Sequence, residues 1–289
     1  LPWATDLPHN SKEDTMPKPG PLLSLIFTLL LIGGCNTLQA TDEPGNSPVL
    51  SRIEQRGELI LGTAANMAPM TYTRDDGKVV GLDIDLARLM AASMEVKLAI
   101  KTMQFADLLP ALKRGEVDVV ISNMTITPKR NMHTAFVGPY MTSGKCIITR
   151  EESIAKAEEA ENLNTPETRM AVMKGSTSED FLRVLLPDAT VITTASDDEA
   201  IQLVRDDKVG GVLTDYPICL STVKNHPDDG FVPLFSLLNY EPIGIALPGN
   251  DPLFVNWTEN FLERADGTGI LGELGERWFG EFGDILQAN

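Results

Sequence analysis

Arg130, Asp215 and two loops that contain Thr125 and Thr177 have the chemical character needed to hold a small zwitterion. A guanidinium binds a carboxylate through two parallel hydrogen bonds, and backbone N–H groups at a helix start can assist it. The carboxylate of Asp215 is a suitable partner for an ammonium group. Hydrogen bonds to charged groups contribute about 1.5 to 3 kcal/mol each. About four of them, less the cost of association, suffice for micromolar binding, which needs about 8 kcal/mol. These residues predict a site for one free α-amino acid.

Predicted strands must position these residues, because each residue closely follows an apolar segment. Those segments are Val117–Ser122, Met170–Met173 and Val212–Thr214. The carboxyl edge of a parallel sheet is where α/β folds bind ligands. Thr127 is a good helix cap just before Arg130, and Ser176 and Thr177 can each cap the helix that follows them. Alone, Arg130 is more typical of a solvated helix residue and Asp215 of a turn or cap, but their shared position favours the site.

Beyond Leu50 the sequence alternates short apolar strands with amphipathic helices, which is typical of an α/β protein with mainly parallel sheets. The charged segment Glu151–Asn164 is predicted to be a solvated surface helix. Two successive sets of elements predict two lobes, and clefts between lobes often hold small molecules. Further strands are expected at Leu59–Gly62, Val96–Ile100, Cys146–Thr149 and Val191–Thr193, and helices at Leu82–Met94, Phe105–Arg114, Ser178–Leu186 and Asp197–Arg205.

The composition disfavours several classes of function. The 289 residues carry a formal net charge of -17, which opposes binding to nucleic acid or to anionic lipid. Three histidines and three cysteines, without a CxxC or HxxxH motif, give no basis for a metal site or a disulfide scaffold. We therefore expect no metal and no cofactor.

The N-terminal region is predicted to be an export signal. After Met16, Lys18 precedes the mainly apolar stretch Leu22–Ile32, which is too short for the roughly 20 residues that span a bilayer. Cys35 follows two glycines and resembles the lipidated cysteine of a bacterial lipobox, which is favoured over ordinary secretory cleavage. We assign residues 1–15 to an artefact of the assigned start, 16–34 to a lipoprotein signal peptide and 35–49 to a lipid-anchored flexible tether.

Eight short motifs lie between Arg56 and Trp278: RGELILGT, DDGKVVGLDIDLARLM, LLPALKRGEVDVVISNMTITPKR, AFVGPY, KGSTSEDF, GGVLTDYP, EPIGIALP and RWFG. In this order and spacing they resemble the extracytoplasmic solute-binding proteins of polar amino acid ABC transporters. The resemblance implies a two-lobed periplasmic-binding-protein fold of type II, in which each lobe is a mainly parallel sheet flanked by helices. It places two crossover strands near Met141–Lys145 and Leu237–Pro242. Lobe 1 is then residues 50–140 and 243–289, and lobe 2 is residues 141–242.

The resemblance also implies roles for individual residues. The family's carboxylate-binding arginine corresponds to Arg130 and its ammonium-binding aspartate to Asp215. The aromatic wall of the family's cleft corresponds to Phe105. The hydroxyl and amide ligands correspond to Ser122, Asn123, Thr125, Ser176 and Thr177.

Three positions depart from the family's pattern. Members that bind basic amino acids have an acidic residue where this chain has Ala64, and an aromatic residue where it has Met67. Met70 replaces an expected Phe. Without a carboxylate at position 64, a cationic side chain would lack its partner. The two methionines either form an adaptable pocket wall or simply pack in the core. We therefore predict an amino acid ligand with a neutral side chain.

The resemblance further implies an ABC permease as partner, a monomer in the periplasm, and membrane contact through the lipid alone. Asn36 rather than Asp follows Cys35, which favours the outer membrane of a Gram-negative host. A receptor that reads the bound form is an open alternative to the permease. For Cys146 and Cys219, two buried thiols are preferred over a disulfide.

Catalysis is a second open alternative, because cyclohexadienyl dehydratases, which act on prephenate or arogenate, resemble the same family. Such an enzyme needs an acid/base group over the substrate ring. Glu241 and His133 are the only extra candidates, and they do not form a convincing acid/base pair. The sequence therefore favours binding without catalysis.

Overall fold

The computed structural model describes residues 47–157 and 159–280 of the chain. The predicted signal peptide, the lipidation site Cys35 and residues 35–46 of the predicted tether lie outside these residues. All described residues belong to one compact unit. Among them, no helix is both long and apolar enough to cross a lipid bilayer.

The folded body begins earlier than the sequence indicated. Helix α1 (Pro48–Arg56) is capped by Ser47, whose side chain accepts a hydrogen bond from the N–H of Leu50. The Ser47 hydroxyl also donates to Asp251 Oδ2 at 2.7 Å, and Ser47 is 3% exposed. The prediction of a tether is therefore wrong for residues 47–49. A serine cap followed by proline starts a helix there, and the distant Asp251 carboxylate fixes the cap.

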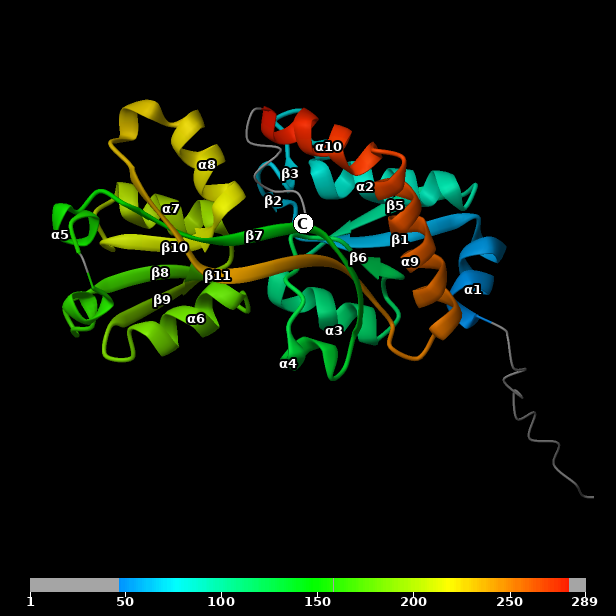
Figure 1. The fold of residues 1–289 in the computed structure, drawn as a ribbon, viewed down its shortest axis with the longest axis horizontal. Helices are drawn as coiled ribbons and strands as arrows, with labels where there is room; N and C mark the ends of the chain where they lie inside the picture. The colour runs from blue at the N-terminus through cyan, green and yellow to red at the C-terminus, as the bar shows by residue number, and fades with distance from the viewer. Residues whose placement is uncertain (1–46, 158, 281–289) are drawn as a thin grey trace, which may run out of the picture. The chain divides into compact units, whose positions relative to one another are not determined.

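One eight-stranded sheet organises the described residues, in the order β5-β1-β6-β11-β7-β10-β8-β9. Three strands are parallel at each end of this sheet. The long strands β7 and β11 lie antiparallel between them and extend into both ends (Figure 1). The bounds are β1 (Glu58–Thr63), β5 (Lys97–Thr102), β6 (Val119–Val120), β7 (Ala135–Thr149), β8 (Arg169–Met173), β9 (Thr190–Thr194), β10 (Gly211–Asp215) and β11 (Val232–Leu247). The predicted α/β fold is confirmed, although its two mainly parallel sheets share two strands and form one.

The remaining elements fall into two groups with separate apolar cores. We call residues 47–134 and 248–280 the first half, and residues 150–231 the second half. The first half also contains β2 (Asn66–Met67), β3 (Thr71–Thr73), β4 (Val79–Val80), α2 (Leu82–Ser93), the 3-10 helix η1 (Phe105–Asp107), α3 (Leu108–Lys113), α4 (Pro128–Asn131), α9 (Pro252–Gly267) and α10 (Ile270–Phe279). The second half contains α5 (Glu152–Ala155), η2 (Ala160–Leu163), α6 (Thr177–Leu185), α7 (Asp197–Arg205), α8 (Tyr216–Asn225) and η3 (Pro227–Asp229).

The largest core lies in the first half, and two smaller cores lie in the second half. Met173 and Ile218 of the second half pack into the core of the first half. The two halves are therefore in direct contact.

The segment 151–164 differs from its prediction. It forms the one-turn helix α5 and the 3-10 turn η2 instead of one surface helix. Ile154 is 2% exposed and anchors α5 in a core of the second half. A single apolar anchor, without a repeating apolar stripe, supports only a short helix.

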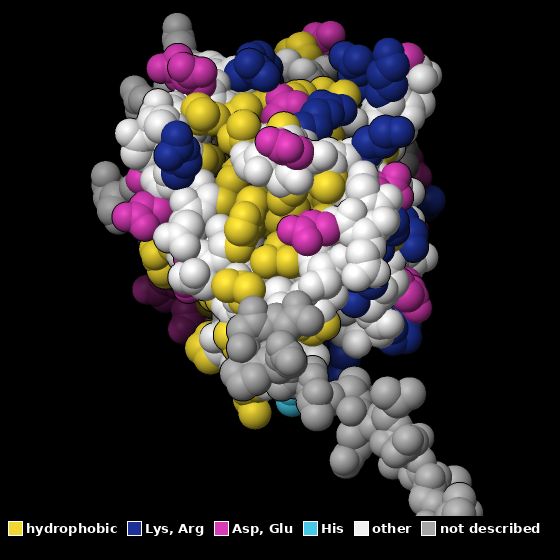
Figure 2. All heavy atoms as spheres, turned by 90° about the vertical axis from the view of Figure 1, so that its right-hand side faces the viewer, with side chains coloured by type: hydrophobic (Ala, Val, Ile, Leu, Met, Phe, Trp, Pro, Cys, Tyr) yellow, Lys and Arg dark blue, Asp and Glu magenta, His cyan; other side chains and the backbone are white. Residues whose placement is uncertain are grey.

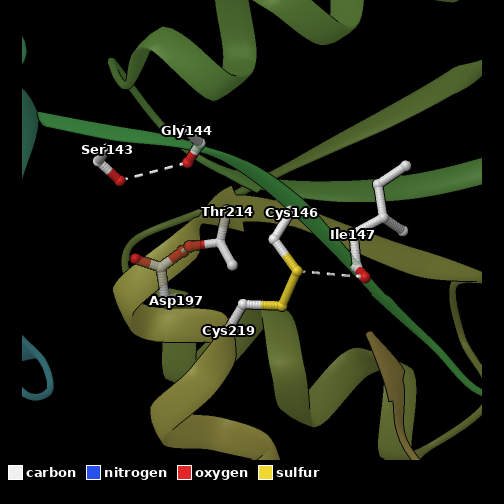
Figure 3. Close-up of a disulfide and its surroundings, with 7 residues drawn as sticks. All are labelled: Ser143, Gly144, Cys146, Ile147, Asp197, Thr214 and Cys219. Atoms are coloured by element: carbon white, nitrogen blue, oxygen red, sulfur yellow. Dashed lines mark hydrogen bonds between the residues drawn. A yellow bond between two sulfur atoms is a disulfide. The ribbon is translucent and has the colours of Figure 1, made fainter. Parts of the chain in front are cut away.

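The two remaining cysteines form a disulfide, so the preference for free thiols was wrong. Cys146 on β7 lies opposite Thr214 in the antiparallel register with β10. Helix α8 begins directly after β10 and brings Cys219 back over β7, with a Cα–Cα separation of 6.2 Å (Figure 3). The pairing depends on the register of strands far apart in sequence, which spacing alone did not reveal.

Charges of both signs lie on one face of the protein (Figure 2). On the face drawn in Figure 2, Lys and Arg side chains are interspersed with Asp and Glu around a central area of apolar side chains. Such a mixture lacks the continuous positive field that attracts nucleic acid.

Candidate functional site

Arg130 lies at the first turn that follows β6, as the sequence predicted. Thr127 caps α4 by accepting a hydrogen bond from the N–H of Arg130. The guanidinium lies 5.6 Å from the centre of the Phe105 ring and donates to the backbone oxygens of Thr125 at 2.8 Å and Gly175 at 3.1 Å. Burial lowers the pKa of Arg130, while the carboxylates of Glu241, Asp215 and Asp180 act in the opposite direction. Arg130 is therefore held between an aromatic ring and a group of acids.

Several predicted site residues meet across the two halves. Asn123 Nδ2 donates to Asp215 Oδ2 at 2.7 Å. The hydroxyls of Thr125 and Thr177 are 3.4 Å apart. These contacts bring the carboxyl ends of β6, β8 and β10 to one place, because the two groups of parallel strands run toward each other from opposite ends of β7 and β11.

Lys145 is a central residue of this place that the sequence analysis missed. Its side chain is 1% exposed, and its Nζ donates to Asp215 Oδ1 at 2.5 Å and to Thr177 Oγ1 at 2.7 Å. Glu241 Oε1 lies 3.5 Å from the same nitrogen, and Glu241 Oε2 accepts a hydrogen bond from Thr177 at 3.0 Å. The sequence contains a signal for this cluster, because Lys145 stands within the otherwise mainly apolar strand segment GKCIIT. A lysine that is buried in such a strand requires acidic partners.

Lys145 and Glu241 form an ion pair that the sequence analysis did not foresee. Both side chains are buried and both contact Thr177, a predicted ligand residue. Lys145 lies on β7 and Glu241 on β11, so the two long strands supply the pair. His133, the other candidate, follows α4 and is exposed.

Asp215 has both carboxylate oxygens engaged within the chain. Oδ1 accepts from Lys145 and Oδ2 accepts from Asn123. It occupies the cap position of α8 but makes no capping hydrogen bond with its side chain. Asp215 also acts on the pKa of Arg130, and its ammonium partner within the described residues is Lys145.

Two predicted hydroxyl ligands support the loops of the site. Ser122 Oγ accepts a hydrogen bond from the N–H of Ala64 at 2.9 Å, which joins the loop after β1 to the end of β6. Ser176 caps α6 by accepting from the N–H of Glu179, and its hydroxyl donates to Met173 O at 2.7 Å. These hydroxyls position the backbone around the site.

Met67 and Met70 are buried in the core of the first half. Met67 belongs to β2, while Met70 lies just before β3. Packing, one of the two roles considered from the sequence, therefore accounts for both side chains.

Asn123 adopts an unusual backbone conformation, with a φ of 47°. Its N–H donates to Asp83 Oδ2 at 2.7 Å, and Asp83 Oδ1 accepts from the hydroxyl of Tyr140 on β7 at 2.7 Å. Within the described residues, Asn123 Oδ1 is buried and has no hydrogen-bond partner. A ligand N–H or O–H group is a natural partner for such an acceptor.

Three known proteins are similar to this chain in sequence or in fold. The L-cystine-binding protein TcyJ of Escherichia coli strain K12 is 26% identical over 257 residues, or 88% of this chain and 93% of its own length. The cyclohexadienyl dehydratase of Pseudomonas aeruginosa is 25% identical over 263 residues, or 91% of this chain and 96% of its own. The crystal structure of the ancestral amino acid-binding protein AncCDT-1, a precursor of cyclohexadienyl dehydratase, is 34% identical with a TM-score of 0.75 and covers 80% of this chain and 99% of that one.

The structural similarity confirms the expected fold, that of type II periplasmic binding proteins. Residues 59–281 match the family model described as bacterial extracellular solute-binding proteins, family 3. This range includes every residue of the site described above, from Ala64 to Glu241. The chain therefore belongs to the bacterial extracellular solute-binding proteins of family 3.

Proposed function

We propose that the protein binds a free α-amino acid with a neutral side chain between its two halves and delivers it outside the cytoplasm to an ABC permease. The observation that carries the proposal is Arg130. Its guanidinium lies over the Phe105 ring of the first half and contacts the backbone of Gly175 in the second half. A carboxylate bound there would touch both halves and would favour their closure.

The charges around Arg130 support a ligand without net charge. Arg130 and Lys145 supply two positive groups, and Asp215 and Glu241 supply two negative groups, while the third acid near Arg130, Asp180, pairs with the exposed Lys129. A zwitterion adds one charge of each sign to this balanced set. The unpartnered Asn123 Oδ1, next to Asp215, is an acceptor for the ligand's ammonium group.

The predicted lobes and anchor complete this proposal. The two halves act as the closing lobes, and β7 and β11 are the strands that bend between them. Lipidation at Cys35 would hold the protein at the cell envelope, and residues 36–46 would give the body reach to its permease.

A thermal-shift screen over the twenty amino acids tests this function, because a ligand that binds only the native state raises its melting temperature. Calorimetry then measures the affinity for each amino acid that raises the melting temperature. Arg130→Ala should abolish binding, since it removes the carboxylate partner. Arg88→Ala, which removes an exposed guanidinium on α2, is the matched control. Unchanged affinity of Arg130→Ala would defeat the assignment.

A second candidate, an enzyme of the cyclohexadienyl dehydratase type, is favoured by the buried pair of Lys145 and Glu241. Removal of water requires a group that gives a proton to the departing hydroxyl, and Glu241, beside Thr177, would be that acid once it has bound a proton. Turnover of prephenate or arogenate, lost in Glu241→Gln, would establish this activity. Amino acid binding without turnover of either compound would reject it.

A further inference from the structure

Lys145 occupies the centre of the site as a built-in ammonium group. From β7 it contacts the end of β10 through Asp215, the start of α6 through Thr177, and β11 through Glu241. Its side chain is buried, so solvent does not screen its charge. Its neighbour Cys146 is fixed to α8 by the disulfide (Figure 3).

We infer that Lys145 determines specificity: it excludes ligands that carry a cationic side chain and restricts the site to ligands without net positive charge. The inference rests on the proposed amino acid binding and names the substrate class of that site. Lys145 satisfies the two carboxylates that would otherwise attract a cation. A ligand with a second positive group would meet a buried like charge and no uncompensated acid.

The geometry around Asp215 strengthens this argument. One oxygen accepts from Lys145 and the other from Asn123, so the carboxylate is engaged on both sides. Glu241 is likewise engaged by Thr177 and lies 3.5 Å from Lys145. A cationic side chain could therefore pair with either acid only by separating it from a buried partner, which is costly.

This effect is separate from the absence of an acid at position 64. Ala64 means only that one attractive group is missing, whereas Lys145 adds a repulsive one. A repulsive group acts on specificity in its own right, because it raises the free energy of the unwanted complex directly. Replacement of Lys145 alone should therefore admit cationic ligands even with Ala64 in place.

The test compares L-arginine with L-citrulline, which has nearly the same shape but no side-chain charge. Calorimetry is performed on the wild type, on Lys145→Gln, which keeps a polar end without charge, and on Lys145→Met. The wild type should bind citrulline more tightly than arginine. In both variants the affinity for arginine should rise about tenfold or more relative to citrulline, since one buried like charge has been removed.

Two further variants test whether the change in arginine affinity arises from the charge of Lys145 and its acidic partners. In Lys145→Gln combined with Glu241→Gln the gain in arginine affinity should shrink, because one of the released carboxylates is gone. Lys208→Met removes an exposed lysine that pairs with Asp206, and it should leave the ratio of the two affinities unchanged.

The outcomes separate this inference from the proposed function. A folded Lys145 variant that binds arginine no better than the wild type overturns the inference, whatever amino acid the wild type binds. A wild type that binds arginine as tightly as citrulline also overturns it. If no amino acid binds the wild type in the screen, the proposed function fails, while gain of arginine binding in the variants still supports the role of Lys145.

Discussion

The carboxylate of Asp83 joins the backbone of Asn123 to the hydroxyl of Tyr140, with a hydrogen bond of 2.7 Å to each. Asp83 lies in the first turn of α2, Asn123 in the loop after β6 and Tyr140 on the connecting strand β7. One buried acid thus ties a site loop to a strand that runs through both halves. Burial raises the pKa of Asp83 to about 7 and also raises that of Tyr140.

Asp83 should make stability depend on pH. Because its folded pKa lies above its unfolded value near 4, the native state binds the proton more tightly. The resulting stability is present below about pH 4 and is lost as pH rises through about 7, by at most about 4 kcal/mol. Urea denaturation at several pH values should show a smaller pH dependence for Asp83→Asn than for the wild type. Asp76→Asn, at an exposed position, should keep the wild-type slope. An unaltered slope in Asp83→Asn would show that this carboxyl does not titrate in that range.

The disulfide should contribute strongly to the stability of the second half. It links residues 73 positions apart, and closure of a loop of this size contributes about 4 kcal/mol in the chain-entropy description. Cys146→Ala combined with Cys219→Ala should therefore lower the free energy of unfolding by about 2 to 5 kcal/mol. Reductant should destabilise the wild type and leave the double variant unchanged. Equal free energies of unfolding for the wild type and the double variant under oxidising conditions would contradict the predicted stabilisation by the disulfide.

Gly175 should control how closely the halves approach. A Cβ at this position would lie 3.1 Å from the Cβ of Ala106 in the first half, and the backbone φ is 77°. Gly175→Ala should therefore weaken ligand affinity, because closure is hindered at the residue whose carbonyl accepts from Arg130. Gly77→Ala is the matched control, since it has a φ of 78° and no atom within 4 Å of the added Cβ. Calorimetry measures the ligand affinity of both variants. Equal affinities would contradict a role of Gly175 in the approach of the two halves.

Ser122 should act as a supporting residue of the site. Ser122→Ala leaves the buried N–H of Ala64 without its acceptor, which should cost about 1 to 3 kcal/mol of stability. Ser143→Ala is a suitable comparison, because that hydroxyl makes only a 3.3 Å contact with the adjacent Gly144 (Figure 3). Chemical denaturation should find the larger loss in Ser122→Ala. A loss no greater than that of Ser143→Ala would show that another group satisfies the Ala64 N–H.

The features that the sequence predicted well depend on local order. Thr127 and Ser176 cap helices because the chain itself brings the hydroxyl to the next turn. Asp215 and Asn123 each follow the carboxyl end of a strand, as predicted, but they meet because β6 and β10 run toward each other from opposite ends of β7 and β11. The caps follow from residue type and spacing alone, whereas the contact between Asp215 and Asn123 also depends on how β7 and β11 pair with the two groups of parallel strands.

The features that escaped prediction depend on pairings between distant strands. Lys145 reaches Asp215 because β7 is antiparallel to β10, and it reaches Glu241 because β11 lies beside β7. The same β7–β10 register places Cys146 under α8. A pattern of apolar residues indicates that a strand exists, but it does not give the partner or the offset of that strand.

Lys145 and Glu241 lie on the two strands that connect the halves. A substitution that alters ligand preference at these positions therefore also acts on the strands that the proposed closure would bend. Changes in ligand selectivity and in the rate at which the two halves open should therefore arise together. A variant that binds a new ligand would also release that ligand at a different rate.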